Sequence, residues 1–149
     1  LNALGRLQRY DCVWDIICDH AELRRGAYAK RIAHTISVLT RKLMIARNRA
    51  LFVELNIKDT IDFRNVTNDD EASRILSNLG LEALDGSYDY LLDMKMRSLT
   101  VERRTRLMEE ATMVEKELGV ASALTPAQEW VRELTELRAA LVGDGRYAA

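Results

Sequence analysis

Few of the residue types that carry out chemistry stand at the spacings that chemistry requires. Cys12 and Cys18 form no CxxC pair, and His20 and His34 have no second ligand at metal-binding spacing. The acidic run 69–71 is better explained as the first turn of a helix, where carboxylates suit the helix dipole. There is no glycine-rich phosphate loop. These patterns argue against a free-standing enzyme and predict reduced, buried thiols in an intracellular protein.

The composition favours long helices in one soluble domain. The chain has 149 residues, of which 48% are hydrophobic and 30% charged, with Pro126 as the only proline and only 7 glycines. The net charge of −1 argues against a primary DNA-binding surface, because such surfaces are normally basic. No apolar stretch approaches the roughly 20 residues of a membrane span, so we expect no membrane partner.

Residues 12–57 are predicted to form one long outgoing helix, capped by Asp11 and preceded by a lead-in over 1–11. The stretch contains no proline, and Gly26 is its only glycine and a predicted hinge. Apolar residues recur at alternating spacings of mostly 3 and 4, which is typical of a coiled-coil seam that needs a partner helix. The predicted seam residues are Tyr28, Ile32, Ile36, Leu39, Leu43, Ala46, Ala50, Val53 and Ile57.

Residues 100–142 supply a returning partner of matching length. Thr100 is predicted to cap a helix that ends at Gly119, which is also a second predicted hinge. Thr125 and Gln128 are predicted to form a capping box that begins the next helix. We expect Trp14 and Trp130 to pack together at the base of the hairpin, and Met108 and Met113 to pack in the seam. The returning seam comprises Leu107, Ala111, Val114, Leu118, Ala127, Trp130, Leu134, Leu137 and Leu141.

The insert between the two helical segments, residues 58–99, is dense in apolar side chains. Asn68 and Glu71 form a capping pair for a helix that Gly80 stops. So small a region is not expected to enclose its apolar surface alone, so we predict a self-association patch. The sequence thus predicts an all-α fold: a long antiparallel coiled-coil hairpin with a globular, dimerising tip and a tail over 143–149. The predicted dimer interface comprises Leu76, Leu79, Leu81, Leu84, Tyr88, Tyr90, Leu91, Leu92, Met94 and Met96.

The order of several motifs carries a family resemblance over roughly residues 4–141. YDYLLDM (88–94) followed by RSLTVE (97–102) resembles the YDYLL-x-M … SLT-x-E run in the breakage-reunion region of eukaryotic and viral type IIA DNA topoisomerases. GRLQRYD (5–11) is similar to the segment after that family's tower domain. Trp130 lies in an xWxxxLxxL pattern similar to the one at the end of this region in the family. The family's R-x3-Y-x-K-R helix opening is matched by Arg24, Tyr28, Lys30 and Arg31.

The resemblance implies a role as the C-terminal coiled coil and exit gate of an ATP-dependent enzyme that passes one duplex through a break in another. It implies a homodimer acting on double-stranded DNA in the nucleus or cytoplasm, with Mg²⁺ and ATP handled elsewhere in the parent protein. The Arg9-Tyr10 and Arg146-Tyr147 pairs do not align with the family's nucleophile, so we expect no catalytic, cofactor or metal residue here. The alternative is a stand-alone helical-hairpin scaffold that dimerises without enzymatic function. The basic residues of this region are typical of a solvated helix face, and under the gate reading they are the candidates for weak contact with passing DNA: Lys95, Arg97, Arg103, Arg104 and Arg106.

Overall fold

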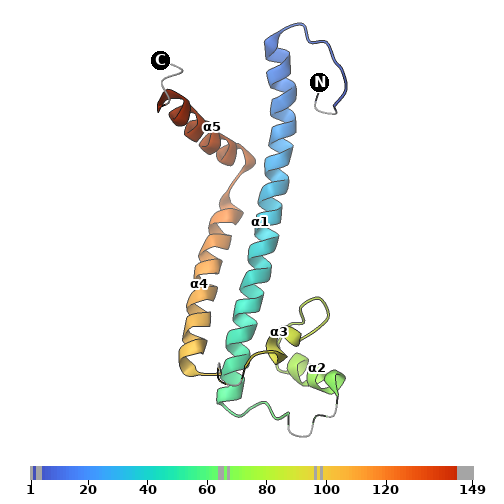
Figure 1. The fold of residues 1–149 in the computed structure, drawn as a ribbon, viewed down its shortest axis with the longest axis vertical. Coiled ribbons are helices and arrows are strands. Elements are labelled where there is room, and N and C mark those ends of the chain that lie inside the picture. Colours follow the sequence, from blue (N-terminus) through green and yellow to red (C-terminus); the bar gives the residue numbers. More distant parts are fainter. Residues whose placement is uncertain are drawn as a thin grey trace. The chain divides into compact units, whose positions relative to one another are not determined.

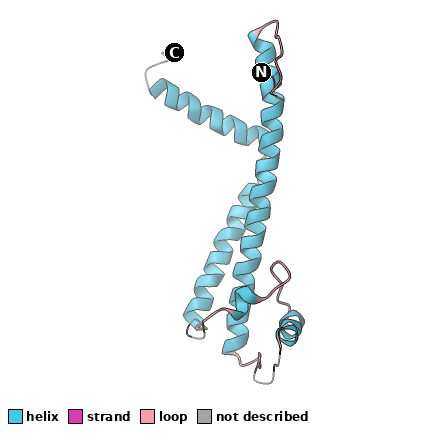
Figure 2. Cartoon of the chain, turned by 45° about the vertical axis from the view of Figure 1, so that its right-hand side comes forward, coloured by secondary structure: helices cyan, strands magenta, loops and turns pink. Residues whose placement is uncertain are grey.

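The computed structural model describes residues 2, 5–63, 66, 68–95, 97 and 99–143, and these residues contain five helices (Figure 1). Figure 2 shows no strand among them, and the all-α class is confirmed. The chain divides into two compact units, one formed by residues 38–119 and the other by 1–37 with 120–149. The helices are α1 (Val13–Ile57), α2 (Asp69–Asn78), α3 (Asp89–Leu92), α4 (Val101–Ala123) and α5 (Pro126–Gly143).

Side chains cap several helices where the sequence predicted it. The Asn68 side chain accepts a hydrogen bond from the backbone N–H of Glu71 at 2.9 Å and so opens α2. The hydroxyl of Thr100 accepts from the N–H of Arg103 at 3.2 Å at the start of α4. At α5 the capping box is complete, since Thr125 and Gln128 exchange side-chain and backbone hydrogen bonds in both directions.

One predicted capping side chain and one predicted helix end are wrong. At the start of α1 the predicted cap was Asp11, but the carboxylate of Asp15 forms the hydrogen bond to the backbone. It accepts from the N–H of Cys12 at 3.2 Å. Gly119 does not end α4, which continues to Ala123. Glycine weakens a helix interior by only about 1 kcal/mol, so the favourable residues on either side of Gly119 decide the outcome.

Within residues 38–119, α1 and α4 pack against each other in antiparallel order. Leu43 and Ala46 of α1 form one buried cluster with Ala111 of α4. Further along α1, Ala50 and Val53 form a second cluster with Leu107. Residue numbers rise along α1 as they fall along α4, so this part of the predicted seam is an antiparallel pair of helices.

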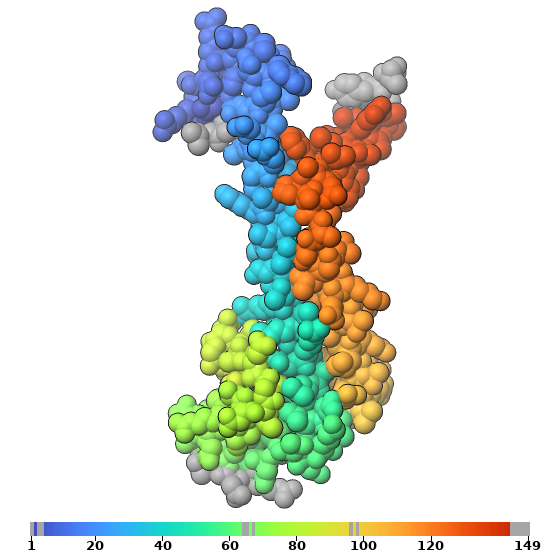
Figure 3. Space-filling model, turned by 180° about the vertical axis from the view of Figure 1, so that it is seen from behind, coloured from blue at the N-terminus to red at the C-terminus, as the bar shows by residue number. Residues whose placement is uncertain are grey.

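The predicted interface residues Leu76, Leu81, Tyr88 and Leu91 form a core of their own together with Phe52 of α1. Their exposed fractions are between 0% and 8%. The insert therefore encloses these four side chains by packing on the end of α1, a surface that the sequence does not reveal. Figure 3 shows this tip (yellow-green) and α4 (orange) on opposite sides of α1.

In the other unit, α5 lies against α1 along little of its length. None of its described side chains is buried. Leu134, Leu137 and Leu141 are 48%, 54% and 38% exposed, so the predicted continuation of the seam along α5 is not formed. Trp14 is 67% exposed, and its predicted packing against Trp130 is wrong.

Two other sequence expectations are corrected by exposure. Both cysteines are free and exposed rather than buried. Met108 and Met113 are 45% and 64% exposed, so neither packs in the seam. In the part of the chain that the structure describes, no helix combines the length and apolar character needed to cross a membrane.

Candidate functional site

The carboxylate of Glu133 on α5 binds several side chains of α1. It accepts hydrogen bonds from the Tyr28 hydroxyl and from Arg31, whose Nη2 lies 2.5 Å away, and it pairs with Arg24 at 3.4 Å. The ring of Trp130 lies against the Tyr28 ring with centroids 6.3 Å apart. This Glu133 cluster unites the helix-opening motif with the tryptophan motif, although about a hundred residues separate them.

Electrostatics within the Glu133 cluster favours the ionised carboxylate. The hydrogen bonds from Tyr28 and then Arg31 hold the pKa of Glu133 below its ordinary value. The guanidinium carbons of Arg24 and Arg31 lie 5.0 and 4.7 Å from the centre of the Tyr28 ring, within cation–π range. Tyr28 is 2% exposed, so its hydroxyl needs this acceptor.

A second polar cluster fixes the tip on α1. Asn48 is 6% exposed, and its side-chain amide donates to the Tyr90 hydroxyl at 2.7 Å and to the backbone carbonyl of Glu82 at 3.3 Å. The Tyr90 hydroxyl in turn donates to the same carbonyl at 2.7 Å. Desolvation by burial raises the pKa of Tyr90. The tip is therefore positioned by directional bonds as well as by its apolar core.

Among the predicted interface residues, Leu92 is the large apolar side chain that the tip leaves exposed, at 37%. Those of intermediate exposure are Leu79, Leu84, Tyr90 and Met94. Met96 lies outside the described residues.

Two of the basic residues predicted to meet DNA are engaged by acidic neighbours. Arg104 binds Glu54 of α1 at 2.8 Å, and hydrogen bonds from Lys58 and then Arg104 lower the pKa of Glu54. Arg106 pairs with Glu102 on the same helix at 2.6 Å. Arg104 thus holds α4 to α1, a structural contribution that the sequence reading did not assign.

The other predicted DNA contacts are more open. Arg97 and Arg103 are exposed and line a shallow hollow of about 280 Å³ with Thr100 at the start of α4. Lys95 is exposed but takes part in a further interaction. This end of α4 is therefore the more basic part of the predicted contact surface.

The two Arg-Tyr pairs and possible metal ligands are the remaining candidates for chemistry. Tyr10 donates its hydroxyl proton to Asp19 at 2.5 Å, and this hydrogen bond raises the pKa of Tyr10, which disfavours the phenolate that a nucleophile needs. Arg146-Tyr147 lies outside the described residues. Within the described ranges no cluster of three or more His, Cys, Asp or Glu is placed to hold a metal ion.

Comparison with known proteins decides the family. A sequence model of the DNA gyrase/topoisomerase IV A subunit matches residues 2–137, nearly the whole chain. The chain belongs to this topoisomerase family. It is 27% identical over 117 residues to DNA topoisomerase 2 of Trypanosoma brucei brucei, an alignment covering 78% of this chain and 10% of that protein.

Other topoisomerases show the same partial coverage. DNA topoisomerase 2 of African swine fever virus (isolate Tick/Malawi/Lil 20-1/1983) is 24% identical, over 93% of this chain and 14% of the viral protein. The fold matches a crystal structure of the Plasmodium falciparum topoisomerase II DNA-binding, cleavage and re-ligation domain with a TM-score of 0.68 and 22% identity. That match covers 98% of this chain and 24% of the other. The chain thus spans 10% and 14% of the lengths of these two curated relatives.

Within this topoisomerase family, the motifs that carried the resemblance occupy two separate sites. Arg24, Tyr28 and Arg31 meet in the Glu133 cluster, whereas 88–94 forms α3 and part of the tip core. Sequence reasoning missed Asn48 and Glu129. Asn48 lies two residues after the seam residue Ala46. A polar residue so close to a predicted seam was the sequence signal that could have identified it as a buried polar contact. Glu129 binds Arg31 at 3.2 Å and Arg132 at 2.7 Å.

Proposed function

We propose that this chain is the exit-gate segment of an ATP-dependent type II DNA topoisomerase, the part that closes the homodimer behind the site of DNA cleavage. The observation that carries the proposal is a compact tip, formed by α2 and α3, that is packed on the end of a long helix with an antiparallel partner. In this role the chain binds a second copy of itself and supplies no catalytic group. Mg²⁺, ATP and the cleaved duplex are handled by other parts of the parent enzyme.

The mechanism follows from a small contact at the end of long helices. A gate must stay shut while DNA is cut and must open for a duplex, and small interfaces open more readily than large ones. Gly26 and Gly119, which lie inside α1 and α4, are the proposed points of bending, because glycine gives the backbone most freedom. Arg97 and Arg103 are the proposed contacts to the passing phosphate backbone.

The proposed dimer contact centres on Leu92. The tip core already uses Leu76, Leu81, Tyr88 and Leu91, so they support the surface from beneath rather than form it. Leu92 is exposed, and other apolar side chains of the tip are of intermediate exposure, so the tip keeps some apolar surface suited to reversible closure.

The test is sedimentation of the chain over a range of concentrations, beside a Leu92→Asp variant. Met108→Asp is the matched control, because Met108 is similarly exposed, at 45%, but lies on α4 away from the tip. A dimer that Leu92→Asp converts to a folded monomer, and that Met108→Asp leaves intact, supports the gate. A monomer at all concentrations, or a dimer insensitive to Leu92→Asp, contradicts it.

A second experiment separates a gate segment from a stand-alone scaffold. The matched segment of DNA topoisomerase 2 from Trypanosoma brucei brucei is replaced by this chain, and relaxation of supercoiled DNA is measured. A gate segment restores relaxation, and Leu92→Asp within the same chimera lowers it again. A scaffold restores none even when the chimera is folded and dimeric.

A further inference from the structure

Basic residues are unevenly distributed along the chain. Although the net charge is −1, residues 23–53 contain eight Lys and Arg and no Asp or Glu. A stretch of one sign attracts the opposite charge whatever the net charge of the chain, so a negatively charged partner is expected to approach α1. Four of the eight basic residues fall close together in the first part of α1: Arg24, Arg25, Lys30 and Arg31.

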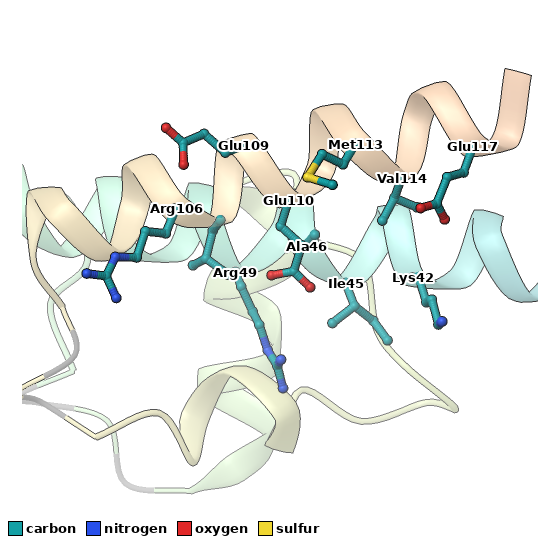
Figure 4. A pocket seen from close by; sticks show the side chains of 11 residues that line it. Lys42, Ile45, Ala46, Arg49, Arg106, Glu109, Glu110, Met113, Val114 and Glu117 are labelled. Atoms are coloured by element: carbon teal, nitrogen blue, oxygen red, sulfur yellow. The ribbon is translucent and has the colours of Figure 1, made fainter.

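The groove between α1 and α4 within residues 38–119 does not suit such a partner. Its volume is about 620 Å³, and α1 contributes Lys42 to its lining (Figure 4). The lining from α4 includes the carboxylates of Glu109, Glu110 and Glu117, which would repel an anion that entered the groove. A negatively charged partner is therefore better accommodated by the first part of α1.

Three donors of α1 converge on the Glu133 carboxylate. Tyr28 and Arg24 reach one of its oxygens, and Nη2 of Arg31 lies 2.5 Å from the other. A phosphodiester carries the same single negative charge on two equivalent oxygens, so these donors suit a DNA phosphate as well as a carboxylate. Glu133 thus occupies a set of donors that could hold a phosphate.

Detachment of α5 would free these donors. This helix buries no described side chain, and its attachment to α1 includes one ring contact and the ion pairs of Glu129 and Glu133 with Arg24 and Arg31. Both carboxylates would leave with α5. Because ion pairs of partly exposed side chains add little stability, a ligand that meets several cations of α1 at once can displace this helix.

We propose that Arg24, Tyr28 and Arg31 bind a phosphate of duplex DNA, and that α5 competes with the DNA for the same three donors. Bound DNA displaces α5, and the exposed Arg25 beside Arg24 meets a neighbouring phosphate. The inference rests on the proposed function only in its choice of duplex DNA as the source of the phosphate. In that setting α5 is released when the duplex reaches the first part of α1 and rebinds after the duplex leaves.

Two substitutions of the same kind on α5 test the competition. Glu133→Gln removes a carboxylate that binds α1, whereas the control Glu136→Gln removes one that pairs with Arg132 on α5 itself. Binding of a short labelled DNA duplex is measured by fluorescence anisotropy. Glu133→Gln should tighten binding by about tenfold, because the donors are free in a larger fraction of chains. Glu136→Gln changes the net charge equally and should alter binding by less than about twofold. Equal effects of the two variants overturn the proposal.

Removing the donors should cancel this gain. Arg24→Gln with Arg31→Gln, added to Glu133→Gln, is expected to return the affinity to that of the unsubstituted chain or below it. The control adds Arg97→Gln with Arg103→Gln, which removes the same charge from the start of α4 and should keep most of the gain. A gain that both pairs of substitutions cancel equally would mean that the DNA responds to net charge alone, and it overturns the proposal.

Hydrogen exchange of the unsubstituted chain tests the displacement of α5 without a variant. Adding the duplex should make exchange in α5 faster and leave exchange in α2 unchanged. Inorganic phosphate at the same phosphate concentration should leave both unchanged, because a single ion meets fewer cations at once. Duplex binding without faster exchange in α5, or release of α5 by inorganic phosphate alone, overturns the proposal. None of these measurements depends on dimerisation, so their failure leaves the sedimentation test of the gate unaffected.

Discussion

Residues 38–119 and the contact between α5 and the first part of α1 hold their helices together by different means. In the first region, three clusters of buried apolar side chains join α1 to α4 and to the tip. In the second, α5 buries no described side chain and is attached through Trp130 and the Glu133 cluster. Apolar packing scales with buried area, whereas ion pairs of partly exposed side chains add little, so α5 should detach at a lower free energy than the tip.

The largest expected difference comes from truncating one leucine in each region. Leu91→Ala should lower the free energy of unfolding of residues 38–119 by about 2–5 kcal/mol, because Leu91 is 0% exposed. Leu137→Ala on α5 should change stability by less than about 0.5 kcal/mol, since Leu137 is 54% exposed. Urea denaturation measures both. Equal losses would mean that α5 is packed in solution and would remove the contrast.

A smaller effect is expected from removing one hydroxyl of the Glu133 cluster. Tyr28→Phe removes the hydrogen bond that the Tyr28 hydroxyl donates to the Glu133 carboxylate, and it keeps the ring against Trp130. The variant should weaken the attachment of α5 by about 1 kcal/mol. Hydrogen exchange should show faster exchange in α5 and unchanged exchange in α2. Tyr88→Phe, which removes the hydroxyl that donates to the Leu81 carbonyl, is the control and should affect the tip instead.

Acid should release α5. The pKa of Glu133 in the folded chain lies below its ordinary value of 4.5 because Tyr28 and Arg31 bind the carboxylate. A carboxylate of lowered pKa contributes stability above its unfolded pKa, and this contribution is lost as pH falls through the folded value. Trp130 fluorescence in a Trp14→Phe background should therefore change below about pH 4.5. Glu133→Gln should abolish that step, and a step that persists in this variant would assign it to another carboxylate.

The smallest expected effect concerns Gly119, which lies within α4 with open space where a side chain would begin. Gly119→Ala should raise the free energy of unfolding by about 0.5–1 kcal/mol, because alanine favours a helix interior. Gly86→Ala is the contrasting variant: Gly86 has φ of +85°, so alanine should destabilise it. Calorimetry measures both variants. A gain in Gly119→Ala is expected of a glycine that lies inside the helix as the proposed point of bending, and a loss would contradict its helical conformation.

Local signals in the sequence predicted what local interactions determine. The caps at Asn68, Thr100 and Thr125 and the repeat around Ala46 and Ala111 are correct, because caps and seams depend on neighbouring residues and on period. The same repeat on α5 predicted a seam that is absent. A repeat shows that a helix has an apolar face but not that a partner lies opposite it.

The candidate sites were harder to predict, since each depends on contacts between distant segments. Tip leucines such as Leu76 were assigned to a surface because Phe52, at the end of a different element, could not be counted as their cover. Conversely, Arg24, Tyr28 and Arg31 were recognised as a motif, yet nothing in their spacing named Glu133 as the common acceptor. Contacts of this kind can be identified only from the three-dimensional structure.

The buried amide of Asn48 bears on how reliably the chain finds its fold. Apolar contacts are not directional, so apolar packing alone would let the tip dock on α1 in more than one register at a small cost in free energy. A tip docked at the wrong height would strand the Asn48 amide without the Tyr90 hydroxyl and the Glu82 carbonyl, at a penalty of about 1–3 kcal/mol. Asn48 thus favours one register of the tip on α1 over the others. The same register places Leu92 in the same position on every molecule.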